Sequence, residues 1–128
     1  MTREIIGDPI IFADGTRVPI SQAVRANGFL FVAGQLGVDA DFALTADDIA
    51  GQTAQALENL KARLAEGGSA PEHVVKVTAW ITDPADFKEF NRVYATVFGA
   101  APPARSTVVS GLLIPGAKVE IEAIAVVP

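Results

Sequence analysis

The sequence contains no cysteine and a single histidine, His73. The lack of cysteine excludes disulfides, thiolate nucleophiles and zinc sites with cysteine ligands. A Ser-His-Asp triad built on His73 is conceivable, but no nucleophile-elbow motif accompanies it. Because residues 71–75 read as a helical turn leading into a strand, we interpret His73 as a surface residue. With one histidine and no cysteine, a metal site is poorly provided for, and we expect none.

Long apolar runs are missing as well. A transmembrane span needs about 18 or more consecutive apolar residues, and charged or turn residues interrupt every candidate run. Residues 1–8 do not contain a basic stretch followed by an apolar core, so we infer no signal peptide and expect a cytoplasmic protein. The ten basic residues are scattered and the net charge is −5. The sequence shows no cluster of basic residues that could bind phosphate groups, so we expect neither nucleic acid nor a membrane as partner.

Apolar residues, in contrast, are abundant. The 128 residues fit one compact domain, residues 1–128, and half of them are hydrophobic. The mean hydropathy is positive, which is high for a chain whose helices are expected to be amphipathic. Surplus apolar surface of this kind usually marks a subunit interface.

The hydrophobic pattern predicts several strands, a helix, a strand, a second helix and two further strands. Thr45 begins the first helix, with Asp48 three residues on as in a shortened capping box, and Gly67 follows its end. The second helix follows Pro84 and ends at Gly99. An Asn27–Gly28 turn joins two strands into a hairpin. The expected strands are Arg3–Ile6, Ile10–Phe12, Thr16–Ile20, Ser21–Arg25, Phe29–Ala33, Val74–Thr82, Arg105–Val109 and Ala117–Val126.

Side-chain alternation assigns faces to these elements. In the strand Val74–Thr82, one predicted face carries Val75, Val77, Ala79 and Ile81, and the other face carries Lys76, Thr78 and Trp80. The second helix carries Phe87, Phe90, Tyr94 and Val97 on one side. The element order fits an α+β domain in which two helices cover one face of a single mixed sheet.

The residue pattern of the last strand indicates what covers the sheet face that the helices leave open. There the outward side chains are Lys118, Glu120, Glu122, Ile124 and Val126. This set is too polar for a core and too apolar at its far end for open water. Three copies that pack these faces together would account for both observations, so we expect a homotrimer.

Residues 103–126 are the most informative stretch for function. Arg105 follows two prolines and an alanine, so it leaves a stiff loop at the mouth of a strand. There a planar guanidinium can hold a carboxylate by two parallel hydrogen bonds. Glu120 and Glu122 point to the same face of an otherwise apolar strand. The plainer alternatives are a surface arginine in an ion pair and two solvated glutamates.

The Pro-Ala-Arg-Ser and Val-Glu-Ile-Glu motifs of this stretch resemble the signature of the RidA family (YjgF/YER057c/UK114), small trimeric proteins that hydrolyse reactive enamines and imines. The resemblance extends from about Pro19 to Val126. It implies a RidA-like, chorismate-mutase-like fold and cofactor-free deamination of a 2-imino acid, or its enamine tautomer, to a 2-oxo acid and ammonia in a cleft between subunits. It also implies that Arg105 binds the substrate carboxylate and that Glu120 handles the water and protons. Glu122 is left as structural.

Three further positions match the family pattern. Gly34 and Gln35 correspond to a family Gly-Gln pair that follows a strand, which implies that Gly34 lets the backbone approach and donate to a ligand. The alternative is that Gly34 and Gly37 only form a turn. Asn91 matches a family asparagine near the site, with helix packing or capping as its alternative.

Three positions depart from the family pattern. Ile20 replaces the usual tyrosine after an early proline, Ala33 replaces a small residue that is often serine, and Thr107 replaces a common cysteine. They imply a pocket of family shape whose preferred substrate is not the smallest imino acid. Alternatives are deamination of a larger substrate such as an aminomuconate, and a noncatalytic trimer that binds small carboxylates or protein partners. The sequence leaves open whether Arg105 and Glu120 of one site come from one chain or two.

Overall fold

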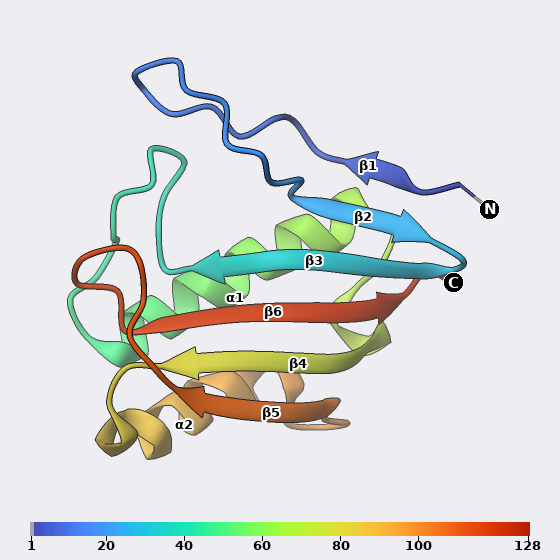
Figure 1. Ribbon diagram of the computed structural model, residues 1–128. Coiled ribbons are helices and arrows are strands. Elements are labelled where there is room, and N and C mark those ends of the chain that lie inside the picture. The colour runs from blue at the N-terminus through green and yellow to red at the C-terminus, as the bar shows by residue number, and fades with distance from the viewer. Residues whose placement is uncertain (1) are drawn as a thin grey trace.

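The computed structural model describes residues 2–128, which form one mixed sheet of six strands and two α-helices (Figure 1). The sheet order is β1-β2-β3-β6-β4-β5; β4 and β5 run parallel and the other neighbours antiparallel. The predicted fold class is confirmed. The elements are β1 (Glu4–Ile6), β2 (Ala23–Ala26), β3 (Phe29–Leu36), α1 (Ile49–Glu66), η1 (Pro71–His73), β4 (Val74–Ile81), η2 (Pro84–Asp86), α2 (Phe87–Phe98), β5 (Ala104–Val109) and β6 (Val119–Val126).

The hairpin β2–β3 forms where it was predicted. Asn27 and Gly28 have φ angles of +52° and +80°, and a two-residue type I′ turn requires positive φ at both positions. The strand β3 continues beyond its predicted end at Ala33, because the pairing with β6 resumes at Gln35 after an irregularity that follows Val32. This bulge accommodates Ala33 and Gly34 within the strand instead of ending it.

Both helices begin later than predicted. The first starts at Ile49 and not at Thr45, because Asp48 is itself the N-cap and its side chain accepts a 3.2 Å hydrogen bond from the Gly51 N–H. Asp83 caps the 3₁₀ turn η2 by accepting from the N–H of Ala85 at 2.9 Å, so α2 starts only after that turn. Within residues 2–128, no helix is long and apolar enough to span a bilayer.

The segment between β1 and β2 is less regular than predicted. The expected strands Ile10–Phe12 and Thr16–Ile20 are reduced to an isolated bridge between Ile11 and Arg17. An isolated two-stranded ribbon is marginally stable without a third strand or a packed face. Ile11 and Phe12 are 57% and 46% exposed, and the Phe12 ring packs against that of Phe42, so this ribbon has little packed surface.

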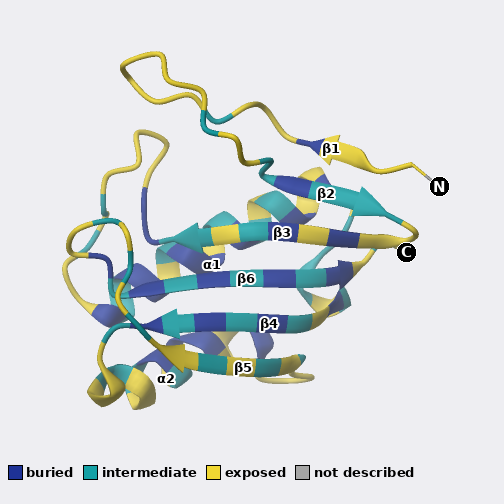
Figure 2. Cartoon of the chain, viewed as in Figure 1, coloured by how far each residue is buried: buried dark blue, intermediate teal, exposed yellow. Residues whose placement is uncertain are grey.

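The core lies between the sheet and the helices, which are behind the sheet in Figure 1, and burial alternates along the strands in Figure 2. On β4 the predicted shared face is correct for Val77, Ala79 and Ile81, which all lie on the buried side. It is wrong for Val75, which is 43% exposed because the pairing with β6 shifts between Val74 and Lys76.

The sheet face opposite the helices, called the open face below, has no covering element within residues 2–128. On β6 the predicted division is correct: Val119, Ile121, Ala123 and Ala125 are buried under the helices, and the alternate residues face outward. Cross-strand partners add apolar surface, because Phe29 pairs with Val126 and Phe31 with Ile124. The open face therefore combines exposed apolar side chains with the two glutamates of β6.

Candidate active site

Arg105 lies against a wall of aromatic rings. Its guanidinium carbon lies 4.6 Å from the ring centre of Tyr94, 5.3 Å from that of Phe90 and 5.7 Å from that of Phe87. The three rings share one face of α2 because they are spaced three and four residues apart. Arginine stacks favourably on aromatic faces, so the wall holds the cation without neutralising it.

Asn91 also contacts Arg105. The Arg105 Nη2 donates a 2.7 Å hydrogen bond to Oδ1 of Asn91, and the Asn91 side chain caps neither end of α2. Among residues 2–128, no carboxylate forms an ion pair with Arg105. A guanidinium has five N–H donors, and this half-buried one keeps most of them for another acceptor.

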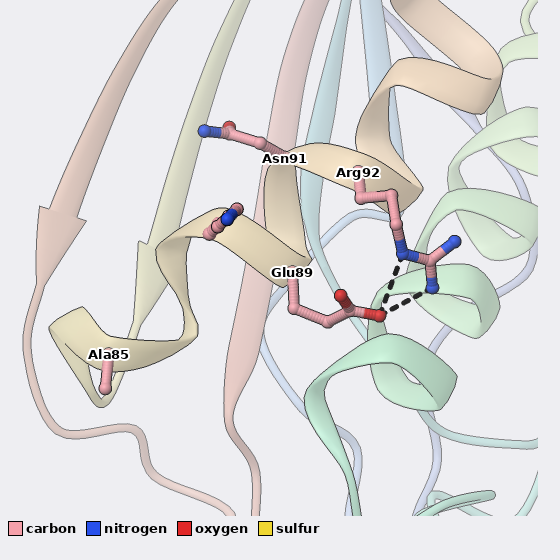
Figure 3. A pocket seen from close by; sticks show the side chains of 5 residues that line it. Ala85, Glu89, Asn91 and Arg92 are labelled. Carbon is pink, nitrogen blue, oxygen red and sulfur yellow. Dashed lines mark hydrogen bonds and ion pairs between the residues drawn. The ribbon is translucent and has the colours of Figure 1, made fainter.

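A shallow hollow of about 640 Å³ lies beside α2 (Figure 3), lined by Ala85, Lys88, Glu89, Asn91 and Arg92. The Nε of Arg92 donates a 2.9 Å hydrogen bond to Glu89. Asn91 points away from this ion pair in Figure 3, and its amide oxygen accepts from Arg105. Asn91 therefore links the hollow to the guanidinium.

Thr107 lies on the same side of β5 as Arg105. It is two residues farther along the strand, pairs with Ala79 of β4 and is half-buried. Side chains two apart in a strand share a face, so the structure brings Thr107 to the face that carries Arg105.

Glu120 lies on the open face and rests on Gly34. It pairs with Trp80 on one side and with Leu36 on the other. A Cβ atom added to Gly34 would overlap the Glu120 carboxylate and lie 2.8 Å from its carboxyl carbon. The glycine therefore makes room for the carboxylate, a steric role additional to the predicted backbone donor.

The surroundings of Glu120 make it a stronger base than a free glutamate. Burial raises the pKa of Glu120 above its usual value, and the negative charge of Glu122, two residues along the same face, raises it further. In the part of the chain that the structure describes, no cation forms an ion pair with either carboxylate. A raised pKa suits a group that must accept and return a proton near neutral pH.

Ala33 and Ile20 both lie near the segment between β1 and β2. The Ala33 N–H donates a 3.0 Å hydrogen bond to the carbonyl oxygen of Gln22. Ile20, two residues earlier, is 51% exposed and lines a shallow groove of about 460 Å³ with Ile5 and Val18. Neither Arg105 nor Glu120 borders that groove.

Arg105 and Glu120 face opposite sides of the sheet. Arg105 pairs with Val77 of β4, which pairs in turn with Ala123 of β6, and Val77 and Ala123 are buried beneath the helices. Glu120 is three residues from Ala123 along β6, so alternation places its side chain on the open face. A single chain therefore does not bring the two groups together.

The contact of the aromatic residues of α2 with Arg105 was not predicted from the sequence. Phe87, Phe90 and Tyr94 were expected on one side of a helix, with no connection to Arg105. Their spacing was the available signal, but the partner depends on the parallel pairing of β4 with β5. Among residues 2–128, no group of three or more acidic or histidine side chains is placed to hold a metal ion.

Comparison with known proteins gives consistent matches over nearly the full length. The family model described as endoribonuclease L-PSP matches residues 13–127. The RutC family protein PH0854 of Pyrococcus horikoshii is 42% identical over 120 residues, which are 91% of this chain and 95% of that protein. Reactive Intermediate Deaminase A, chloroplastic, of Arabidopsis thaliana is 41% identical over 108 residues, 84% of this chain and 58% of the relative.

Solved structures also match this fold. A crystal structure of a proposed endoribonuclease from Thermotoga maritima superposes with a TM-score of 0.84. The two sequences are 41% identical, and the alignment covers 98% of each chain.

Proposed function

This chain belongs to the YjgF/RidA family, which includes a reactive intermediate deaminase, and from that premise we propose that it hydrolyses reactive 2-imino acids and their enamine tautomers. The products are a 2-oxo acid and ammonia. The reaction uses no cofactor, takes place in the cytoplasm, and occurs in clefts between the subunits of a homotrimer.

The observation that carries this proposal is the state of Arg105. Its guanidinium is half-buried, stacked on three rings and held by Asn91, yet no acid within residues 2–128 neutralises it. Such a group is preorganised for a carboxylate, which it can bind through two parallel hydrogen bonds. A 2-imino acid supplies this carboxylate next to the reacting carbon.

The chemistry then needs one water and one proton acceptor. Glu120 takes a proton from water as the oxygen attacks the iminium carbon, which gives a carbinolamine. Glu120 returns the proton to the nitrogen, takes the proton of the carbinolamine hydroxyl as the carbon–nitrogen bond breaks, and passes it to the departing ammonia, so the 2-oxo acid and ammonium leave. The iminium carbon is already electrophilic, so positioning supplies much of the catalysis.

Two chains must contribute to each cleft, because Arg105 and Glu120 face opposite sides of one sheet. The open face also presents Phe29, Phe31 and Val126, each at least 36% exposed, which a neighbouring subunit would cover. A closed ring of three satisfies both requirements with a single type of contact. Light scattering at micromolar concentration should therefore report a trimer, and a monomer would remove the basis for an intersubunit cleft.

A coupled assay tests the activity. An amino-acid oxidase generates 2-imino acids of graded side-chain size, and the lifetime of each is followed with and without this protein. We expect faster loss of the imine in the presence of the protein, and loss of that effect in Arg105→Ala. An unchanged imine lifetime across the series, together with binding of 2-oxo acids, would favour the noncatalytic carboxylate-binding alternative.

The position of Ile20 bears on substrate size. Isoleucine has no phenol hydroxyl with which to orient a small substrate, and Ala33 and Thr107 also depart from the family pattern. We therefore expect 2-iminobutanoate and larger imino acids to be preferred over 2-iminopropanoate. An aminomuconate belongs in the same series as the largest member.

A further inference from the structure

The hydroxyl of Tyr94 is buried and has no hydrogen-bond partner within residues 2–128. The residue as a whole is 5% exposed. A buried hydroxyl loses its hydrogen bonds to water on folding, so one that is left without a partner calls for an explanation. Phe90, Phe98 and Leu57 are apolar residues of the same core, so the phenol group is not required for packing alone.

Arg105 is the polar group that faces Tyr94. Its guanidinium carbon is closer to the ring of Tyr94 than to those of Phe90 and Phe87. Burial raises the pKa of Tyr94, and the charge and N–H groups of Arg105 near the phenol oppose that rise. The contact falls outside hydrogen-bond geometry in this structure. At neutral pH the phenol stays protonated, and its oxygen can accept a hydrogen bond.

We propose that Tyr94 is a positioning residue whose hydroxyl accepts a hydrogen bond from Arg105 when a carboxylate ligand is bound. Asn91 already holds one nitrogen of the guanidinium, and Tyr94 fixes a second, so the remaining N–H groups are aimed at the ligand. Hydrogen bonds at binding sites are often loose without ligand and tighten in the complex. This role rests on the proposed function, because the ligand carboxylate brings about the change.

The wild-type protein offers a direct test, because Tyr94 is its only tyrosine. Labelling tyrosine with ¹³C at Cζ gives a single resonance that responds to hydrogen bonding at the phenol oxygen. Titration with 2-oxobutanoate should move this resonance, with the same saturation as calorimetry of the same ligand. A resonance that stays in place at saturating 2-oxobutanoate would overturn the role of Tyr94.

Substitution separates positioning from packing. Tyr94→Phe keeps the ring and removes the hydroxyl, so the affinity for 2-oxobutanoate should fall by about 10-fold, the effect of one hydrogen bond to a charged group. In turnover, KM should rise by more than kcat falls, because Glu120 is untouched. The melting temperature should stay the same or rise, since a buried group without a partner is removed.

Thr53→Val is the matched control. The Thr53 hydroxyl is also buried without a partner, but it lies in α1. Its removal should leave the affinity for 2-oxobutanoate unchanged. If Tyr94→Phe behaves in the same way, Tyr94 has only a structural role. If the wild-type protein binds no 2-oxo acid and leaves imines unchanged, the proposed function itself fails; binding that Tyr94→Phe does not weaken contradicts only the role of Tyr94. Should Tyr94→Phe not fold, the titration of the labelled wild type decides.

Discussion

The two sides of the sheet surround their charged groups differently. On the helix side, Arg105 lies against three rings and donates to Asn91, all within one chain. On the open face, Glu120 rests on the backbone of Gly34, with exposed apolar side chains elsewhere on that face. One chain therefore completes the surroundings of the cation but not those of the acid. The difference indicates that assembly, and not folding of the single chain, would complete a catalytic cleft.

The largest expected effect separates the tasks of the two sides. Glu120→Gln keeps the shape of the side chain but cannot accept a proton, so kcat should fall by roughly 10²–10⁴-fold. Binding of 2-oxo acids should remain nearly intact, because Arg105 is unchanged. Steady-state kinetics and calorimetry measure the two quantities. Full turnover in Glu120→Gln would show that the water is activated elsewhere, for example by Thr107.

Mixing two impaired variants tests whether Arg105 and Glu120 meet across a subunit boundary. Arg105→Ala should weaken carboxylate binding by about 10-fold for each hydrogen bond lost. In trimers assembled randomly from equal amounts of Arg105→Ala and Glu120→Gln, about one quarter of the clefts receive both intact residues if each cleft is shared by two chains. Activity should then return to about a quarter of the wild-type value. No recovery, in trimers shown to be mixed, would contradict the shared cleft.

Gly34→Ala tests how closely the open face controls Glu120. The added Cβ overlaps the carboxylate, which is the flexible end of its side chain, so Glu120 should move with little cost in stability. A displacement of about 1 Å at a reacting group can lower the rate by roughly 100-fold, so kcat should fall by up to this factor. Gly111→Ala is the control, because no atom lies within 4 Å of its added Cβ. Equal kcat values for the two variants would contradict the contact.

Glu122→Gln should shift the pH dependence. Burial and the charge of Glu122 raise the pKa of Glu120, so kcat/KM should fall with decreasing pH at a higher pH than for an ordinary glutamate. Removing the charge of Glu122 lowers that pKa, and the acid limb should move to lower pH, while the effect of burial remains. The free energy of unfolding depends on pH in the opposite direction to that of an ion-paired acid. The contribution of Glu120 to stability is full below its pKa in the unfolded chain and is lost as the pH rises through its raised pKa in the folded protein. An unmoved acid limb would show that Glu122 does not act on Glu120.

Ile20→Tyr should have the smallest effect, a change in selectivity of a few-fold. The phenol fills space and restores a hydroxyl at the family position, so kcat/KM for small imino acids should rise a few-fold relative to that for bulky ones, below the roughly 10-fold typical of one changed pocket contact. Ile11→Tyr, at another exposed isoleucine, is the control. Selectivity that is unchanged across the graded series would show that Ile20 does not line the pocket.

Much of the fold could be predicted because the signals are local. The Asn27–Gly28 turn depends on two residues that tolerate positive φ, and the two faces of β6 follow from alternation along one strand. The predicted helix start at Thr45 was wrong because Thr45 and Asp48 are both acceptable N-caps, and the cap formed at Asp48. The face predicted for Val75 was wrong because the register shift that exposes this side chain depends on β6, more than forty residues away.

For the candidate site, the sequence by itself determined which groups are present: Arg105 after a proline-rich loop, and two glutamates on one strand face. It could not determine what each group meets. The parallel pairing of β4 with β5 and the packing of α2 decided that Arg105 lies against Phe87, Phe90 and Tyr94, and the bulge in β3 decided that Glu120 rests on Gly34. Local patterns specify the conformation of neighbouring residues, whereas register and packing arise from contacts between distant segments. For that reason only the tertiary structure shows that Arg105 and Glu120 face opposite sides of the sheet.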